Sequence, residues 1–307
     1  MKKATLKDIA KMADVSVATV SYVLNNVVKQ TIPDETRSRV LDAAKQLNYV
    51  PNLAARSLVK QKSGLIGILI NRAENEGFWR QLRYSQWINR LEQLLTGYGY
   101  HVVLFGLDAA SPKLDIISER KLDGVFVVDV KTENFHLISS HFSVGVPLIV
   151  VDSIIDDALF YKVNYDYLDA FMAAQASASV PFEYVIIDNF NNKELVEHIA
   201  FASKLEPDCI HIMQNEQALE LFLRNHAHKK GIILNEFAAI SAAKYVDPAN
   251  LTVICSAGCP EILPFSAGRI AYGDRKPEAA FQLMLQLLDH SKKGPESSYI
   301  LVKAIND

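Results

Sequence analysis

The sequence predicts an α/β protein in two parts, a small all-α head at the N-terminus and a larger body with parallel sheets. Apolar residues recur at helical spacing over residues 5–47, and turn residues separate them. From residue 63 onward, short apolar runs of strand type alternate with helical stretches, which is typical of parallel sheets covered by helices. Charge divides at the same place: residues 1–62 hold 11 Lys and Arg against 5 Asp and Glu, whereas the whole chain has a net charge of −3. A basic head on an acidic body is expected when one end meets a polyanion.

The composition is that of an ordinary globular protein. The chain has 307 residues, of which 50% are hydrophobic and 22% charged, so two or three domains are expected. It has no run of about 18 apolar residues, and no membrane span is predicted. A signal peptide is not predicted either, because Lys7, Asp8 and Lys11 stand where its apolar core would lie. We therefore expect a cytoplasmic protein without a membrane partner.

The head begins with two short helices joined by a turn. Thr5 and Asp8 have the spacing of a capping box, which starts the first helix. Ser16 can cap a second helix over residues 17–24, and a third starts near Pro33 and runs to Leu47. The residues expected to face inward are Leu6, Ile9, Ala10 and Ala13 in the first helix and Val20, Val23 and Leu24 in the second. Two short helices with a turn of three or four residues indicate a helix-turn-helix motif.

The second helix predicts contact with nucleic acid. Hydroxyl side chains gather along it: Ser16, Thr19 and Ser21. Such groups near a helix N-terminus can bind phosphate together with free backbone N–H groups. In the major groove, Val17 and Ala18 would make apolar contacts and Tyr22 one hydrogen bond. The alternative is that the hydroxyls are solvated and Tyr22 packs on the first helix.

Residues 5–58 resemble the head of the LacI/GalR-type bacterial transcription regulators. The matching stretches are residues 5–10, 15–21, 36–37, 47–49 and 51–52, together with Asn25, Ala54 and Leu58. The resemblance implies a homodimer on a pseudo-palindromic DNA operator, with positions 17, 18 and 22 reading bases. It also implies DNA contacts from Thr5, Leu6, Asn25, Asn52, Ala55 and Leu58. Family members commonly carry Arg where this chain has Tyr22, so a different contact is expected there.

This resemblance divides the chain into three parts. Residues 1–50 form the helix-turn-helix domain, residues 51–62 a hinge helix and linker, and residues 63–307 an effector-binding and dimerisation domain. The hinge helix is implied to enter the minor groove, where Leu58 wedges between base steps and bends the DNA.

The body resembles the two-lobed periplasmic-binding-protein-like sensor that this family uses, which has parallel sheets. Lobe 1 is expected over about residues 63–153 and 270–293, and lobe 2 over about 158–266 and 297–307. Chain crossings are then expected near residues 153–160, 266–270 and 291–297.

Apolar runs and helical periodicity predict the elements of the body. Strands are expected at residues 65–70, 102–105, 122–128, 146–151, 184–187, 209–213, 231–234, 251–254, 270–273 and 299–302. Helices are expected at residues 77–95, 112–120, 135–141, 167–176, 193–204, 216–226 and 277–288.

Ligands of this fold bind in the cleft at the carboxyl ends of strands, and the effector candidates are Phe78, Trp79, Asp152 and Asn215. The resemblance implies that Asp152 and Asn215 hydrogen-bond effector hydroxyls and that an aromatic at 78–79 lies against the ligand. Each candidate also has a structural alternative: helix core or dimer contact for the aromatics, a loop cap for Asp152, and a helix N-cap for Asn215. The Arg that the family carries near position 197 and its Gly-x-Asp-Asp pattern near 255–258 are absent. These two absences argue against an ordinary sugar pocket, and the effector expected in the cleft is a sugar-like molecule or another metabolite.

Enzymatic chemistry is not expected, since the chain has no G-x-S-x-G, Walker or G-x-G-x-x-G motif and its histidines are scattered. Cys209, Cys255 and Cys259 lack the further ligands that a zinc site needs, so no metal or other cofactor is expected. The first hypothesis is a transcription regulator, in the usual form a repressor, with operator DNA, a second copy of itself and a small metabolite as partners. The alternatives are a solute-binding protein of transport type and a regulator controlled by a protein partner.

Overall fold

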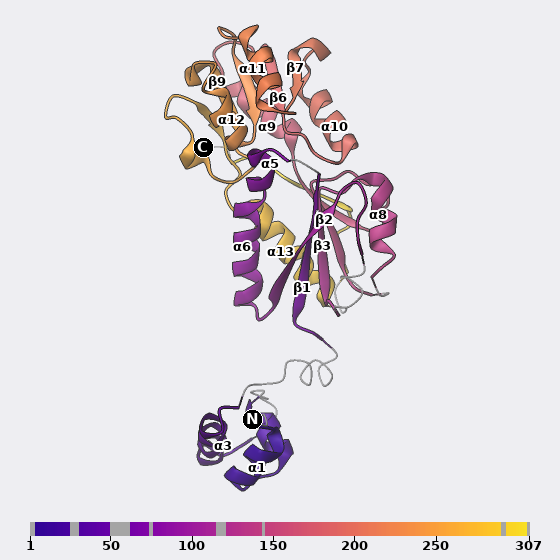
Figure 1. Ribbon diagram of the computed structural model, residues 1–307, viewed down its shortest axis with the longest axis vertical. Helices are drawn as coiled ribbons and strands as arrows, with labels where there is room; N and C mark the ends of the chain where they lie inside the picture. Colours follow the sequence, from indigo (N-terminus) through magenta and orange to yellow (C-terminus); the bar gives the residue numbers. More distant parts are fainter. Residues whose placement is uncertain are drawn as a thin grey trace. The chain divides into compact units, whose positions relative to one another are not determined.

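A computed structural model describes residues 4–24, 31–49, 62–73, 76–114, 121–142, 145–289 and 293–305 (Figure 1). The chain divides into two compact units, residues 1–63 and residues 64–307, which we call the head and the body. Asn25, Asn52, Ala55 and Leu58, and with them the expected hinge helix, lie outside the described residues. Most of the helix expected at 112–120 does so as well. In the part of the chain that is described, no helix is long and apolar enough to cross a membrane.

The described part of the head consists of α1 (Leu6–Ala13), α2 (Val17–Leu24) and α3 (Asp34–Gln46). The predicted capping box starts α1: the Thr5 N–H donates to Asp8 Oδ2 over 2.8 Å, and the Asp8 N–H donates to Thr5 Oγ1 over 3.4 Å. Asp14 takes the left-handed conformation, with φ 51°, and so turns the chain between α1 and α2. The core of the head comes from all three helices and contains Ile9, Ala10, Ala13, Val20, Val23, Val40 and Ala43.

The described residues of the body form two parallel sheets. The first has the strand order β11-β5-β4-β3-β1-β2 and the second the order β10-β9-β8-β6-β7. The first sheet contains β1 (Leu65–Arg72), β2 (His101–Asp108), β3 (Gly124–Val128), β4 (Leu148–Val151), β5 (Tyr161–Tyr165) and β11 (Tyr299–Val302). The second contains β6 (Tyr184–Ile187), β7 (Ile210–Ile212), β8 (Gly231–Leu234), β9 (Leu251–Ile254) and β10 (Gly268–Ile270). We call each sheet with its helices lobe 1 and lobe 2.

Helices cover the sheets, as the alternation of strands and helices predicts. Lobe 1 holds α6 (Ser85–Gly97), α8 (Thr132–Ser139) and α13 (Arg275–Leu288). Lobe 2 holds α9 (Tyr167–Ser177), α10 (Lys193–Ser203), α11 (Glu216–Arg224) and α12 (Glu236–Ala242), with 3₁₀ turns at Pro207–Cys209, Pro248–Asn250 and Pro260–Ile262. In Figure 1, α6 and α13 lie side by side on one face of the first sheet and α8 lies on the other. Ile66, Ile68 and Ile70 accordingly face one core, and Leu69 faces the other.

The expected boundary between the lobes is wrong in two places. β5 pairs with β4 and with β11, so residues 161–165 and 299–302 belong to lobe 1. The assignment of residues 297–307 to lobe 2 therefore fails. The crossing expected near 291–297 fails as well, because α13 packs on β5 and β11 of the same lobe. The sheet of lobe 2 begins after the chain leaves β5, and the chain returns to the sheet of lobe 1 between β10 and α13.

No strand was predicted at β5, because polar residues interrupt its apolar run. Lys162 and Asn164 are 1% and 3% exposed, which is unusual for such side chains in a sheet. Each finds a partner inside the protein. Lys162 Nζ donates to the Asp157 carbonyl over 2.5 Å, and Asn164 Nδ2 donates to the Ser153 carbonyl over 3.0 Å. The bonds satisfy groups that would otherwise make burial costly.

The helix expected at residues 77–95 is two helices, α5 (Phe78–Leu82) and α6, separated at Arg83 and Tyr84. The two helices belong to different lobes. α6 packs against α13 and β2 of lobe 1, whereas α5 packs against α12 of lobe 2. The break thus lies where the chain passes between the lobes, and periodicity cannot reveal it because both pieces are helical.

Candidate DNA-binding surface and interlobe cleft

The outward side of α2 matches its prediction from the sequence. Val17 and Tyr22 are 41% and 38% exposed, and Ala18 is exposed as well. Val20 and Val23 face the opposite way and are buried in the core of the head. The Tyr22 side chain therefore projects from α2 and is not buried in the core of the head. An exposed row of this kind is available to base edges in a groove.

The hydroxyl residues lie where α2 begins. Ser16 Oγ accepts from the Thr19 N–H over 3.0 Å and lies 2.8 Å from Thr19 Oγ1, so Ser16 caps the helix as predicted. Ser21 is half-buried one turn further on. In α1, Thr5 is exposed and Leu6 is half-buried against the core. The N-terminus of a helix such as α2 also carries a positive partial charge that favours a phosphate.

In the body, buried polar residues follow the strands of both lobes. Asp129 follows β3, Asp152 follows β4, Asp188 follows β6 and Asn235 follows β8, and each is at most 3% exposed. Asp129, Asp152 and Asn235 have φ values of 53°, 50° and 78°. Asp and Asn tolerate this left-handed region better than other side chains. Since the carboxyl ends of the two sheets meet, these side chains define the cleft between the lobes.

Arg83 spans this cleft. Its Nη2 lies 2.6 Å from Asp188 Oδ1 of lobe 2, and its Nη1 lies 3.3 Å from Asp129 Oδ2 of lobe 1. The guanidinium also stacks 4.3 Å from the ring centroid of Phe190. Burial alone would lower the pKa of Arg83, but Asp188, Tyr84 and Asp129 outweigh it and raise that pKa above the usual value. The side chain stays charged and is held from both lobes.

Two asparagines of lobe 2 add further bonds to lobe 1. The Asn191 N–H donates to Asp129 Oδ1 over 2.7 Å, and Asn191 Nδ2 donates to the Asn71 carbonyl over 2.9 Å. Asn192 is fully buried, and its Oδ1 accepts from the Ile154 N–H over 2.9 Å. Burial raises the pKa of Asp129 to about 6, although Arg83, Arg80 and the Asn191 bond oppose the shift.

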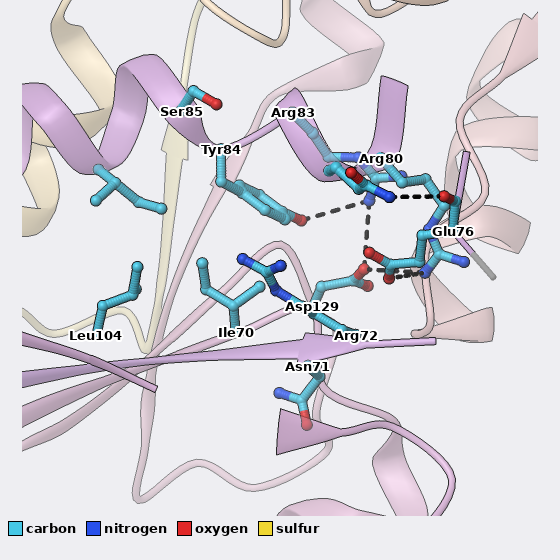
Figure 2. A pocket seen from close by; sticks show the side chains of 12 residues that line it. Ile70, Asn71, Arg72, Glu76, Arg80, Arg83, Tyr84, Ser85, Leu104 and Asp129 are labelled. Carbon is cyan, nitrogen blue, oxygen red and sulfur yellow. Dashed lines mark hydrogen bonds and ion pairs between the residues drawn. The ribbon is translucent and has the colours of Figure 1, made fainter. Parts of the chain in front are cut away.

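A pocket of about 170 Å³ opens beside this network (Figure 2). Arg72, Arg80 and Arg83 line it together with Glu76 and Asp129. Figure 2 shows Arg80 and Arg83 turned toward Asp129, with the Tyr84 hydroxyl near Arg83. The volume lies below the range of about 300–1,000 Å³ that is usual for small-molecule sites.

The four effector candidates do not share one pocket in the structure. Asp152 reaches the cleft, where its carboxylate pairs with Lys276. Trp79 is buried in the core of lobe 2, and Phe78 is 43% exposed beside it. Asn215 is exposed and accepts from the Ala218 N–H over 2.9 Å, so it is the N-cap of α11. The helix-cap alternative describes Asn215, and the helix-core alternative describes Trp79.

The buried polar residues at the cleft that were not singled out from the sequence are Arg83, Asp129, Asp188, Asn191, Asn192, Asn235 and Lys276. A usable signal existed for part of this set. Asp129, Asp188 and Asn235 each come directly after a short apolar run, as Asp152 does. Applying the strand-end rule to every predicted strand would have found them. Arg83 has no such signal, because its partner Asp188 lies 105 residues away.

Comparison with known proteins agrees with this architecture. Residues 5–52 match the family model described as bacterial regulatory proteins, lacI family. The ribose operon repressor of Halalkalibacterium halodurans is 28% identical over 78% of this chain and 73% of its own length. The repressor PurR of Mannheimia succiniciproducens is 34% identical over 48% of this chain. This match covers 43% of the length of that repressor.

Solved structures show the same fold. A lac repressor dimer bound to operator and the anti-inducer ONPF matches with a TM-score of 0.73 over 99% of this chain and 97% of the other, at 16% identity. A complex of the transcriptional regulator CelR with cellobiose matches with a TM-score of 0.60 over 99% and 98%, at 14% identity. A capped helix-turn-helix head and a two-lobed parallel-sheet body define a DNA-binding transcription regulator with a sensor domain. The head thus matches the lacI family of bacterial regulatory proteins over residues 5–52, and the longer match to the ribose operon repressor extends this similarity into the body.

Proposed function

We propose that this protein is a cytoplasmic transcriptional repressor that binds a pseudo-palindromic operator as a homodimer and is modulated by a small molecule between its lobes. The exposed row on α2 carries the proposal. Val17, Ala18 and Tyr22 project from a helix whose other side is fixed in the core of the head. The head thus offers a rigid helix for the major groove, and its basic balance supplies the attraction to phosphates.

Base reading falls to three side chains of α2 in this proposal. Val17 and Ala18 can contact a thymine methyl, and the Tyr22 hydroxyl can donate or accept one hydrogen bond. Ser16, Thr19 and Ser21, with Thr5 and Leu6 of α1, would position the helix on the backbone. We also propose that Asn25, Asn52, Ala55 and Leu58 contact DNA, on the resemblance to the family.

A single head reads only one half-site, so an inverted repeat requires two copies of the chain. The similar lac repressor structure is described as a dimer bound to operator. In this chain β2 is the edge strand of the first sheet, and Leu104 on it is 49% exposed. This edge offers backbone groups and apolar surface for a second copy.

Control by a small molecule rests on the two lobes. A ligand that prefers one arrangement of the lobes shifts the population of that arrangement, and with it the placement of the two heads. Coupling of this kind typically changes affinity about 5- to 150-fold. Binding blocks polymerase in the mode proposed, and the effector regulates that block. Among the predicted effector residues, Asp152 has the strongest structural support, because it lies in the cleft. We therefore retain it as an effector contact.

Selection from a random duplex pool with the full-length protein tests the proposal. We expect enrichment of an inverted repeat with half-sites about 10 base pairs apart or a multiple of that spacing. Affinity for the repeat should fall steeply between about 50 and 200 mM salt. Failure to enrich any repeat over random DNA would contradict the proposal. A melting shift with one class among sugars, sugar phosphates and purines would identify the effector class.

A further inference from the structure

In the sequence, α5 lies between two elements of lobe 1, β1 and α6, but it packs against lobe 2. Trp79 is 5% exposed and packs in the lobe 2 core with Met213, Leu219 and other residues. Its carbonyl accepts a hydrogen bond from Asn235 Nδ2 over 3.3 Å. A Cβ on Gly77 would lie 2.4 Å from the Trp79 ring, so a larger residue at this position would force the indole or the backbone to move. The segment is therefore shaped to insert this ring.

Arg83 closes the same connection from the other end of α5. It lies at the break between α5 and α6, and its guanidinium is paired with Asp188 and Asp129. Its Nη2 also donates to the Asn189 carbonyl over 3.1 Å. Asp188 is shared, because its Oδ2 accepts from Asn235 Nδ2 over 2.8 Å. The Trp79 contact and the Arg83 contact are thus joined through Asn235 and Asp188.

The groups in this network are buried and bonded to one another. Arg83 is 3% exposed, Asp129 2% and Asp188 0%. Among the atoms of the Arg83 side chain, only Nε lacks a partner in the described part of the protein. A buried ion pair is costly to separate, because removing one partner leaves a charge in a low-dielectric site. The buried side chains of this network thus hold the carboxyl ends of the strands in the two lobes together.

We propose that residues 77–84 are an interlobe clasp, in which Trp79 anchors α5 in lobe 2 and Arg83 occupies the cleft as a built-in ligand. The clasp keeps the lobes closed through the contacts of the protein alone. An effector then acts by displacing Arg83 from Asp188, which frees α5 and alters the lobe arrangement. The consequence for DNA rests on the proposed function, whereas lobe closure does not.

Replacing Arg83 tests the clasp in the full-length protein. The chain contains two tryptophans, Trp79 and Trp87, so a Trp87→Phe background leaves Trp79 as the single reporter. We expect Arg83→Ala in this background to shift the Trp79 emission to the red and to increase the radius of gyration in X-ray scattering. Arg83→Lys should open the lobes partially, because an ammonium cannot contact Asp188, Asp129 and the Asn189 carbonyl together.

Rescue of Arg83→Ala by an added guanidinium compound distinguishes the clasp from a merely structural role of Arg83. The space left by Arg83→Ala has the carboxylates of Asp188 and Asp129 on its walls, so methylguanidinium at millimolar concentration should restore the emission and the radius. Sodium chloride at equal ionic strength should not. Arg224→Ala is the matched control, because Arg224 is 72% exposed and pairs with Glu220 on the surface of lobe 2. It should leave both readouts unchanged.

The clasp is overturned if folded Arg83→Ala keeps the emission and scattering of its parent. Should that variant fail to fold, Asp188→Asn decides instead, since it preserves volume and removes the charge. If the Asp188→Asn protein keeps the radius of gyration and the Trp79 emission of its parent, the clasp is overturned as well.

Failure of the clasp and failure of the proposed function give different results. Loss of the clasp leaves operator binding by the wild-type protein intact. Absence of sequence-specific DNA binding leaves the spectroscopic and scattering results intact.

Discussion

Lys276 Nζ lies 2.5 Å from each carboxylate oxygen of Asp152, and the two side chains are only 2% and 4% exposed. The ammonium also lies 4.1 Å from the ring centroid of Tyr165. The carboxylate expected to contact an effector is thus held by a lysine from α13, 124 residues away in sequence. A ligand that bonds to Asp152 must compete with this pair.

Lys276→Met should destabilise the body strongly. The methionine keeps most of the volume, but Asp152 becomes a buried charge without a partner, which costs about 3–5 kcal/mol. Urea unfolding followed by circular dichroism measures the loss. Adding Asp152→Asn removes the isolated charge, so the double variant should recover part of it. Equal stabilities of the single variant and the wild type would show that the pair contributes nothing.

Thr5→Ala should loosen α1. The substitution removes the side-chain oxygen that accepts from the Asp8 N–H, and the loss of such a cap costs about 1 kcal/mol. Hydrogen exchange of the amides in residues 6–13 of the full-length protein should accelerate about fivefold. Lys7→Ala, an exposed change in the same helix, should not accelerate it. Equal exchange in both variants would argue against the capping box.

Tyr22→Ala should weaken binding to the selected repeat without affecting the fold. The side chain is 38% exposed, so the melting temperature should hold, while loss of a base contact costs about 1–3 kcal/mol of discrimination. Fluorescence anisotropy against the selected and a scrambled duplex gives the difference. Leu41→Ala, at a 49% exposed position in α3, is the control. If Tyr22→Ala discriminates as well as wild type, Tyr22 does not read a base.

The raised pKa of Asp129 predicts a specific dependence of stability on pH. Burial raises this pKa from 3.8 to about 6, so the folded protein binds a proton at pH values where the unfolded chain has lost it. The contribution is fully present below pH 3.8 and is lost as the pH rises through about 6. Unfolding free energies measured from pH 4 to 7 should contain this falling component, and Asp129→Asn should lack it. Identical pH profiles of the two proteins would contradict the assignment.

The head could be predicted from the sequence in detail because its determinants are local. Thr5 and Asp8 are three residues apart, and Ser16 and Thr19 are as well, so spacing alone identifies both caps. The inward positions of Val20 and Val23 also follow from helical periodicity. The exposure of Val17 and Tyr22 then follows from geometry.

The body was predictable in type but not in its connections. Apolar runs located most strands, whereas β5 was hidden by Lys162 and Asn164, whose partners lie on a neighbouring loop. The cleft depends on contacts between distant positions. Arg83 and Asp188 meet only after both sheets have formed, and no local pattern marks either of them as a partner of the other.

Photo-crosslinking from position 22 tests the central claim that α2 lies in a groove of DNA. A full-length protein with Tyr22→benzoylphenylalanine is irradiated on the selected repeat, beside one with the same residue at Phe201, which is 85% exposed on α10 of the body. The account predicts crosslinks from position 22 to bases in each half-site and none from position 201. Crosslinks from position 201 with none from position 22 would contradict it.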